Sequence, residues 1–125
     1  MGDEDRRPWG HWIVTDIGDD FVVKRITINP GARLSLQYHQ HREEIWTVVR
    51  GGGVAVVGDE TVSLEVGQTV RVPVLKSHRM TNTGQDPLVF IEVQKGLELD
   101  EDDLVRLEDD YGRSVSVSAS SATAE

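Results

Sequence analysis

The segment of residues 31–51, GARLSLQYHQHREEIWTVVRG, carries most of the information about the fold. Gln37 and His39 lie two residues apart, and Glu44 follows shortly before the apolar run of residues 45–49. Side chains alternate between the two faces of a β-strand, so Gln37 and His39 share a face. Polar side chains on an inward face are costly unless they line a solvated or metal-filled cavity. The segment therefore predicts two strands beside a polar cavity.

A second segment, residues 67–82 (GQTVRVPVLKSHRMTN), has its own glycine and proline punctuation and contributes His78. In the first segment, five residues separate Gly31 from Gln37, and six separate Glu44 from the closing glycine. Both sets of intervals resemble the two motifs of cupins, with Gln37 where most cupins have their first histidine. The resemblance implies a double-stranded β-helix, the small jelly roll, with four metal ligands: Gln37, His39, Glu44 and His78.

The ligand types indicate a divalent ion. Imidazole nitrogens with carboxylate and amide oxygens suit zinc, which we favour, and also manganese, cobalt, iron and nickel. A His-x-His pair formed by His39 and His41 is the competing assignment, and a histidine in a strand is more often a surface or core residue than a ligand. The glycine-to-glycine count places the pair at residues 37 and 39, so we interpret His41 as lying beside the metal or facing substrate.

The whole chain is a succession of short candidate strands separated by Gly, Asn, Asp and Pro, which predicts an all-β fold with hardly any helix. The residues of an acidic segment, 100–110, include three apolar side chains at near-helical spacing and are expected to form a short helix or turn. We expect residues 1–113 to form a single cupin domain and residues 114–125 to be a disordered tail. The candidate strands are residues 13–15, 21–28, 33–38, 45–50, 54–57, 61–64, 69–72, 78–82 and 88–94.

Composition restricts the partners. The 125 residues are enough to bury one core, and the absence of cysteine excludes disulfides and thiolate metal sites. A net charge of −9 disfavours nucleic acid and anionic membranes, so an anionic substrate needs a local cluster of cations. No apolar run is long enough for a membrane span, and the first residues lack the features of a signal peptide. We expect a cytoplasmic protein that binds neither nucleic acid nor membrane.

Longer stretches of the chain resemble the cupin domain of type II phosphomannose isomerases, which usually follows a mannose-1-phosphate guanylyltransferase in a bifunctional enzyme. The resemblance covers residues 7–113, and we expect a free-standing isomerase or a relative of one, without the nucleotidyltransferase. The stretches are RPWG (7–10), VKRI (23–26), PGARLSLQ (30–37), HREEIW (41–46), HR (78–79), PL (87–88), IEVQ (91–94), EDD (101–103) and YGR (111–113).

The resemblance implies the same metal set and assigns isomerase activity to Arg42 and to Arg106. Departures from the family pattern occur at three positions. Family members commonly have histidine where this chain has Ile45 and often where it has Gln40, and cupins generally have glycine at the position of Leu75. The Ile45 departure weakens transfer of the full activity, because a polar group lost near the site could be a proton carrier.

Interconversion of mannose 6-phosphate and fructose 6-phosphate moves a proton between C2 and C1 through a cis-enediol. The reaction needs a base, and His41 and Glu92 are the candidates. It also needs an electrophile for the oxygens, which a divalent metal supplies, and a cationic grip on the phosphate. Lys24 shares its strand face with apolar residues, an inward position for a charge. Lys24 and Arg79 are therefore expected to bind the phosphate, together with Arg42 and Arg106.

Two other functions fit the same scaffold, since fold does not fix function. One is a non-catalytic sugar- or metabolite-binding cupin, and the other is a metal-dependent enzyme such as a dioxygenase. We also expect a homodimer, because several apolar side chains are expected on an outward face that a two-fold partner could cover. These side chains are Leu34, Leu36, Tyr38, Trp9 and Trp12.

Overall fold

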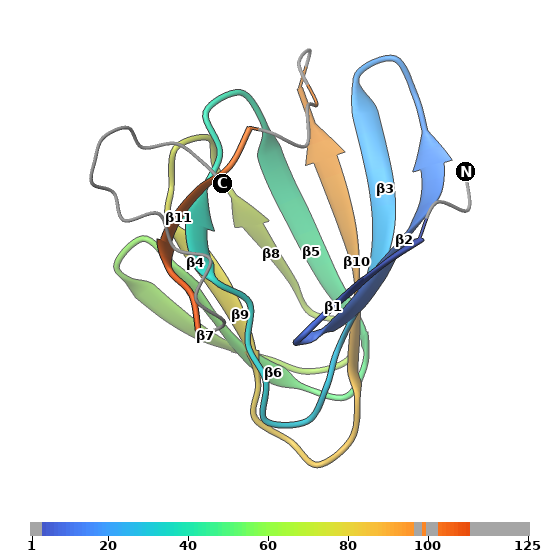
Figure 1. The fold of residues 1–125 in the computed structure, drawn as a ribbon, viewed down its shortest axis with the longest axis vertical. Coiled ribbons are helices and arrows are strands. Elements are labelled where there is room, and N and C mark those ends of the chain that lie inside the picture. Colours follow the sequence, from blue (N-terminus) through green and yellow to red (C-terminus); the bar gives the residue numbers. More distant parts are fainter. Residues whose placement is uncertain (1–3, 97–98, 100–102, 111–125) are drawn as a thin grey trace.

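The computed structural model describes residues 4–96, 99 and 103–110, and these residues form two antiparallel sheets with no helix (Figure 1). The larger sheet has the order β1 (Glu4–Arg7), β2 (Gly10–Ile17), β3 (Phe21–Ile28), β10 (Leu88–Lys95), β5 (Glu43–Arg50) and β8 (Thr69–Val72). The smaller sheet has the order β11 (Val105–Glu108), β4 (Leu36–Tyr38), β9 (His78–Asn82), β6 (Gly53–Val57) and β7 (Glu60–Leu64). The all-β, two-sheet cupin architecture predicted from the sequence is confirmed. Within the described part of the chain, no helix is long and apolar enough to span a membrane.

The core lies between the sheets and follows the alternation of the strands. In β5, the side chains of Glu44, Trp46 and Val48 are buried, whereas their neighbours along the strand are more exposed. The ring of Trp46 packs against that of Phe90, with the centroids 5.4 Å apart. Burial of each large apolar side chain contributes about 1.5–3 kcal/mol. One end of the inward face is thus a rigid apolar core, which fixes the direction of Glu44 at the other end.

The acidic segment of residues 100–110 differs from the predicted helix or turn, because its residues 105–108 form strand β11. Backbone pairing decides this outcome: Val105 lies opposite Tyr38, and Arg106 lies opposite Gln37. An ion pair between Arg33 and Asp110, with a nitrogen–oxygen distance of 2.7 Å, holds the end of the segment. The near-helical spacing of its apolar residues could not reveal a partner strand far away in the sequence. The predicted domain end at residue 113 and the disordered tail lie outside the described residues.

Three of the apolar residues expected on the outward face lie elsewhere: Leu34 and Trp9 are buried, and Trp12 packs against the core. Leu34 is 6% exposed and Trp9 is 7% exposed, and both belong to the core. Leu34 precedes β4 in an irregular stretch, so the strict alternation assumed from residue 34 to residue 38 does not hold. This part of the argument for a dimer is therefore wrong. Homodimerisation itself stays a prediction, which a measurement of the molar mass by light scattering would test.

Turn positions carry a specific backbone requirement at Gly51 and Leu75. Gly51 has a φ of 77°, and a Cβ at this position would lie 2.7 Å from the carbonyl oxygen of Pro87. Leu75 has a φ of 70° although it carries a full side chain, which is 62% exposed. Left-handed backbone is unfavourable for residues other than glycine. The backbone at Leu75 is therefore strained. The amide of Leu75 donates a hydrogen bond to the carbonyl oxygen of His39.

Candidate metal centre and adjoining cavity

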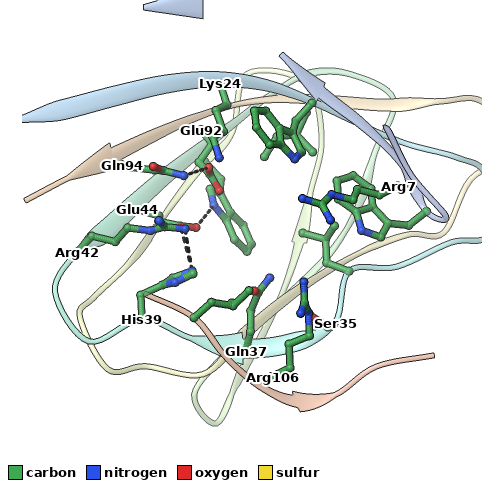
Figure 2. Close-up of a pocket in the computed structure, with 16 residues that line it drawn as sticks. Arg7, Lys24, Ser35, Gln37, His39, Arg42, Glu44, Glu92, Gln94 and Arg106 are labelled. Carbon is green, nitrogen blue, oxygen red and sulfur yellow. Dashed lines mark hydrogen bonds and ion pairs between the residues drawn. The ribbon is translucent and has the colours of Figure 1, made fainter. Parts of the chain in front are cut away.

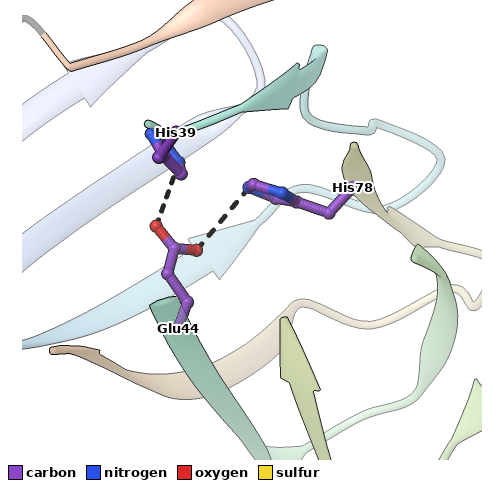
Figure 3. Close-up of side chains that lie close together, drawn as sticks. All are labelled: His39, Glu44 and His78. Carbon is purple, nitrogen blue, oxygen red and sulfur yellow. Dashed lines mark ion pairs between the residues drawn. The ribbon is translucent and has the colours of Figure 1, made fainter. Parts of the chain in front are cut away.

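Three predicted ligands converge at one end of the space between the sheets. His39, Glu44 and His78 each offer a ligand atom, and these atoms all lie within 4.8 Å of one another (Figure 3). They come from three places in the fold: the position directly after β4, the start of β5 and the start of β9. All three side chains are at most 4% exposed. A buried cluster of two imidazoles and one carboxylate is a donor set suited to a divalent transition metal.

The two histidines are oriented by hydrogen bonds to backbone carbonyls. His39 Nδ1 lies 2.6 Å from the carbonyl oxygen of Asp103, and His78 Nδ1 lies 2.9 Å from that of Lys76. A carbonyl only accepts, so each Nδ1 carries a proton, and each Nε2 faces the carboxylate of Glu44. The Nε2 atom of His78 is buried without a hydrogen-bond partner among the described residues. Two imidazole nitrogens directed at one buried carboxylate form a donor set that fits a bound cation.

The carboxylate of Glu44 is the centre of this cluster. Its Oε2 lies 3.1 Å from His39 Nε2, and its Oε1 lies 3.7 Å from His78 Nε2. Burial by itself raises the pKa of Glu44, but the charges of His39, His78 and Arg42 hold that pKa well below the ordinary value. Burial lowers the pKa of His78 to about 4, against the attraction of Glu44. A charged carboxylate beside a neutral imidazole is the protonation state that metal ligands require.

Gln37, the fourth predicted ligand, lies next to this cluster. It is directly opposite His78 in the β4–β9 pair and opposite Arg106 in the β4–β11 pair. Residues directly opposite each other in a sheet project from the same face. The side chains of His78, Gln37 and Arg106 therefore form one row across the smaller sheet, and Gln37 also lines the neighbouring cavity.

That cavity has a volume of about 100 Å³ and opens beside the cluster between the two sheets (Figure 2). Its lining includes His39 and Glu44, which joins the metal cluster to the cavity. Four cationic and two acidic side chains line it, in a protein whose net charge is −9. The six ionisable residues other than histidine are Arg7, Lys24, Arg42, Arg106, Glu44 and Glu92.

Glu92 is a buried carboxyl group on β10 within this lining, only 6% exposed. Gln94 Nε2 donates a hydrogen bond of 2.9 Å to Glu92 Oε1. The pKa of Glu92 is raised to about 8, mainly by burial and also by the charge and hydrogen bond of Glu44, against the opposing charge of Lys24. The Lys24 ammonium lies 3.9 Å from the centre of the Trp12 ring, within cation–π range. The structure therefore supplies a protonatable group in contact with a predicted metal ligand.

Arg42 links the metal cluster to the cavity. Its Nε lies 3.1 Å from Glu44 Oε2, and its Nη2 lies 3.3 Å from His39 Nε2. Its Nη1 is buried without a partner among the described residues, as is Oε1 of Gln94. A buried donor and a buried acceptor left unpaired beside one cavity indicate a polar ligand, because each costs about 1–3 kcal/mol unless satisfied.

Three residues considered at the sequence level lie away from the cavity. The side chain of His41 is exposed and is not part of the lining. Arg79 is buried outside the cavity, where it donates hydrogen bonds to the carbonyl oxygen of Leu34 at 2.9 Å and to Glu108 at 3.1 Å. Ile45 projects from the opposite face of β5 to Glu44, so its departure from the family pattern does not remove a group from the cavity.

Asp103 and Arg7 are among the site residues to which no role was assigned from the sequence, as are Ser35 and Gln94. Asp103 fixes the loop after β4, since its carboxylate accepts hydrogen bonds from the backbone amides of Gln40 at 2.7 Å and His41 at 2.9 Å. Arg7 lines the cavity from β1. Both lie in stretches that resemble the family, RPWG and EDD, but the resemblance assigned neither of them a role.

Comparison with known proteins gives a consistent family. Residues 2–109 match the family described as mannose-6-phosphate isomerase C-terminal. The chain is 51% identical over 107 residues to the xanthan biosynthesis protein XanB of Xanthomonas campestris pv. campestris, covering 86% of this chain and 23% of that protein. It is 50% identical to the alginate biosynthesis protein AlgA of Pseudomonas aeruginosa, covering 86% of this chain and 22% of that protein. The chain thus spans less than a quarter of the length of these curated relatives.

Solved structures share the fold at lower identity. A cupin-2 domain from Rhodospirillum rubrum is 22% identical with a TM-score of 0.65, covering 73% of this chain and 62% of that one. The oxalate decarboxylase of Lactobacillus farciminis is 22% identical with a TM-score of 0.73, covering 84% of this chain and 33% of that one. At this level of identity the likeness shows the fold alone.

Proposed function

Because the chain belongs to the C-terminal cupin family of mannose-6-phosphate isomerases, we propose that it interconverts mannose 6-phosphate and fructose 6-phosphate with the aid of a divalent metal ion. One observation carries this proposal: the buried carboxyl group of Glu92 and the His39–Glu44 part of the metal cluster line the same cavity. Aldose–ketose isomerisation requires a group that carries a proton between two adjacent carbon atoms. It also requires a positive charge that stabilises the negative charge developing on the oxygens of those carbons. This cavity offers both.

His39, Glu44 and His78 would hold the ion, with Gln37 beside them. A bound divalent ion, for which zinc is our first choice, polarises the carbonyl and hydroxyl oxygens and stabilises the negative charge that develops on them. Metal-ligating histidines in proteins are usually oriented by a second hydrogen bond, as His39 and His78 are here.

Glu92 is the proposed proton carrier. Its carboxylate removes the proton from C2 of the open-chain aldose and returns it to C1, while the hydroxyl proton moves from O2 to O1, so the ketose forms with no net gain or loss of atoms. The hydrogen bond from Gln94 keeps the carboxyl group in the cavity, and the charge of Lys24 favours its ionised form. A well-placed general base contributes about 10²- to 10⁴-fold in rate.

The polar lining supports a sugar rather than an apolar substrate. A hydroxyl group both accepts and donates, so one sugar hydroxyl could satisfy the unpaired Nη1 of Arg42 or the unpaired Oε1 of Gln94. The four cations of the lining favour an anionic ligand despite the acidic surface. A dioxygenase acting on an apolar compound would leave these groups without partners.

An isomerase assay on three samples tests the proposal: metal-loaded protein, metal-stripped protein and the metal-loaded Glu92→Gln variant. We expect equilibration of the two sugar phosphates by the first sample, and a loss of about 100-fold or more in the other two. Glu60→Gln, an exposed carboxylate on β7, is the matched control and should retain full activity. If Glu92→Gln keeps its rate, Glu92 is not the proton carrier.

A further inference from the structure

The cavity has a second cationic region, away from the metal cluster. We infer that Arg7 and Arg106, with the hydroxyl group of Ser35, form the subsite that binds the phosphate of the substrate. All three residues line the cavity, from β1, β11 and the stretch before β4. Only the identity of the ligand as a hexose 6-phosphate rests on the proposed function.

The register of the larger sheet directs Arg7 inward. Arg7 lies opposite Gly10 in the β1–β2 pair, and Gly10 lies opposite Ile28 in the β2–β3 pair. Ile28 is fully buried in the core, so the side chain of Arg7 projects from the core face of the sheet. Gly10 leaves no side chain between them, and a Cβ there would lie only 2.0 Å from the carbonyl oxygen of Thr27. β1 thus directs the Arg7 side chain toward the interior, and its cross-strand neighbour, Gly10, is a position that accommodates only glycine.

The smaller sheet directs Arg106 into the same space. Arg106 lies opposite Gln37, which lines the cavity, and therefore shares its face. Ser35 lies two residues before Gln37 in the chain and is 3% exposed. Two guanidinium groups and a hydroxyl group provide the planar, multidentate donor set that binds tetrahedral oxyanions well.

The position of this subsite agrees with the shape of the substrate. Figure 2 shows Arg7 and Ser35 on the opposite side of the cavity from Arg42 and Glu44. Arg7 lies in the same cross-strand row as Ile28, and Glu92 lies in the same row as Lys24. Ile28 and Lys24 are four residues apart along β3, so the two rows are about 13 Å apart at the backbone. In an open-chain hexose 6-phosphate, the phosphate is likewise at the far end from C1 and C2. Binding it between Arg7 and Arg106 would place the reacting carbons toward Glu92.

Calorimetric titration of metal-loaded protein with mannose 6-phosphate tests this subsite. Arg7→Ala should weaken binding at least tenfold, which is about 1.4 kcal/mol. Arg7→Lys keeps the charge but not the planar guanidinium group, so its affinity for mannose 6-phosphate should lie between those of the wild type and Arg7→Ala. Arg6→Ala is the matched control, because the adjacent side chain is exposed and projects from the other face of the strand.

A purely structural role for Arg7 predicts a different result, namely that Arg7→Ala lowers metal affinity and the unfolding temperature together. We expect both to stay close to the wild-type values. Equal affinities of Arg7→Ala and Arg6→Ala for mannose 6-phosphate, or no binding by the wild type, would overturn the subsite. Binding of mannose 6-phosphate that depends on Arg7, without isomerisation, would support the subsite and contradict the proposed activity. Failure of the subsite and failure of the proposed activity are therefore distinguishable.

Discussion

The ring of His39 is held by the backbone of Asp103, whose carbonyl oxygen lies 2.6 Å from Nδ1 although 64 residues separate the two in the chain. The carboxylate of Asp103 also accepts hydrogen bonds from the two backbone amides that follow His39. The segment before β11 is therefore part of the metal centre, and a ligand at one end of the cavity depends on chain from the other end of the sequence.

Asp103→Ala should weaken metal binding. The change removes both carboxylate contacts with the loop after β4, so the backbone carbonyl that orients the His39 ring is held less firmly against it. Loss of a group that orients a metal ligand typically costs 10- to 100-fold in affinity, and we expect about tenfold here. Competition against a chromogenic chelator measures the affinity, with Asp59→Ala in an exposed turn as the control. Equal affinities for the two variants would show that the carboxylate does not position His39.

His39→Ala and His78→Ala should each abolish stabilisation by metal. A ligand present at 100 times its dissociation constant raises the free energy of unfolding by about 2.7 kcal/mol. Thermal unfolding with and without zinc measures this effect, and His41→Ala serves as the control because its exposed side chain lies outside the cavity lining. If His41→Ala alone loses the response to metal, the His-x-His assignment replaces ours.

Arg42→Lys should reduce catalytic efficiency about tenfold or more with metal still bound, which corresponds to about 1.4 kcal/mol of transition-state stabilisation. Lysine keeps the charge but cannot reproduce the separate contacts that the guanidinium makes with Glu44 and His39. Steady-state kinetics with Arg50→Ala, an exposed position on β5, as the control measure the effect. Equal rates for both variants would leave Arg42 without a role in the reaction.

The stability of the metal-free protein should depend on pH through Glu92. Its pKa is raised to about 8 by burial, so between the unfolded value near 4.5 and pH 8 the folded state holds a proton that the unfolded state releases. The contribution of Glu92 to stability therefore falls as pH rises through this window, whereas His78, whose pKa is lowered from 6.5 to about 4, makes stability rise with pH between those two values. Glu44, whose pKa is lowered, acts in the opposite direction and only below about pH 4.5. Thermal unfolding from pH 6.5 to 8, above the range in which His78 acts, should show a smaller decline for Glu92→Gln than for the wild type, and parallel curves would contradict the assignment.

Leu75→Gly should stabilise the protein by up to about 1 kcal/mol, because glycine adopts the φ of 70° without the cost that leucine incurs there. The side chain of Leu75 is 62% exposed, so little packing is lost. Val74→Gly, which removes a neighbouring side chain from backbone without positive φ, should instead destabilise. Chemical denaturation measures both, and a lower stability for Leu75→Gly would mean that the leucine side chain makes a contribution of its own.

Local patterns predicted the parts of the fold that depend on local chemistry. The alternation and turn residues predicted β3, β8 and β9 with the bounds observed. Motif spacing identified His39, Glu44 and His78, which the structure brings together. The same reasoning missed β1, whose sequence EDRR has no apolar residue, and misassigned β11, which exists through its pairing with β4.

Contacts over long distances in the sequence explain the remaining differences. Asp103 and Arg7 lie in stretches that resemble the family, but their contacts have no local signal. Asp103 acts on a loop 62–64 residues away, and Arg7 reaches the cavity through three paired strands. Arg79 and Ile45 are the converse cases, because their motif positions drew attention to side chains that face elsewhere.

Proton NMR of mannose 6-phosphate in D₂O with the metal-loaded protein tests the central claim most directly. The account predicts that signals of fructose 6-phosphate grow in and that deuterium from solvent enters at the carbon atoms between which Glu92 moves the proton. Metal-stripped protein should leave the spectrum unchanged over the same period. An unchanged spectrum with protein that demonstrably holds its metal would contradict isomerase activity and favour a cupin that only binds sugar phosphate.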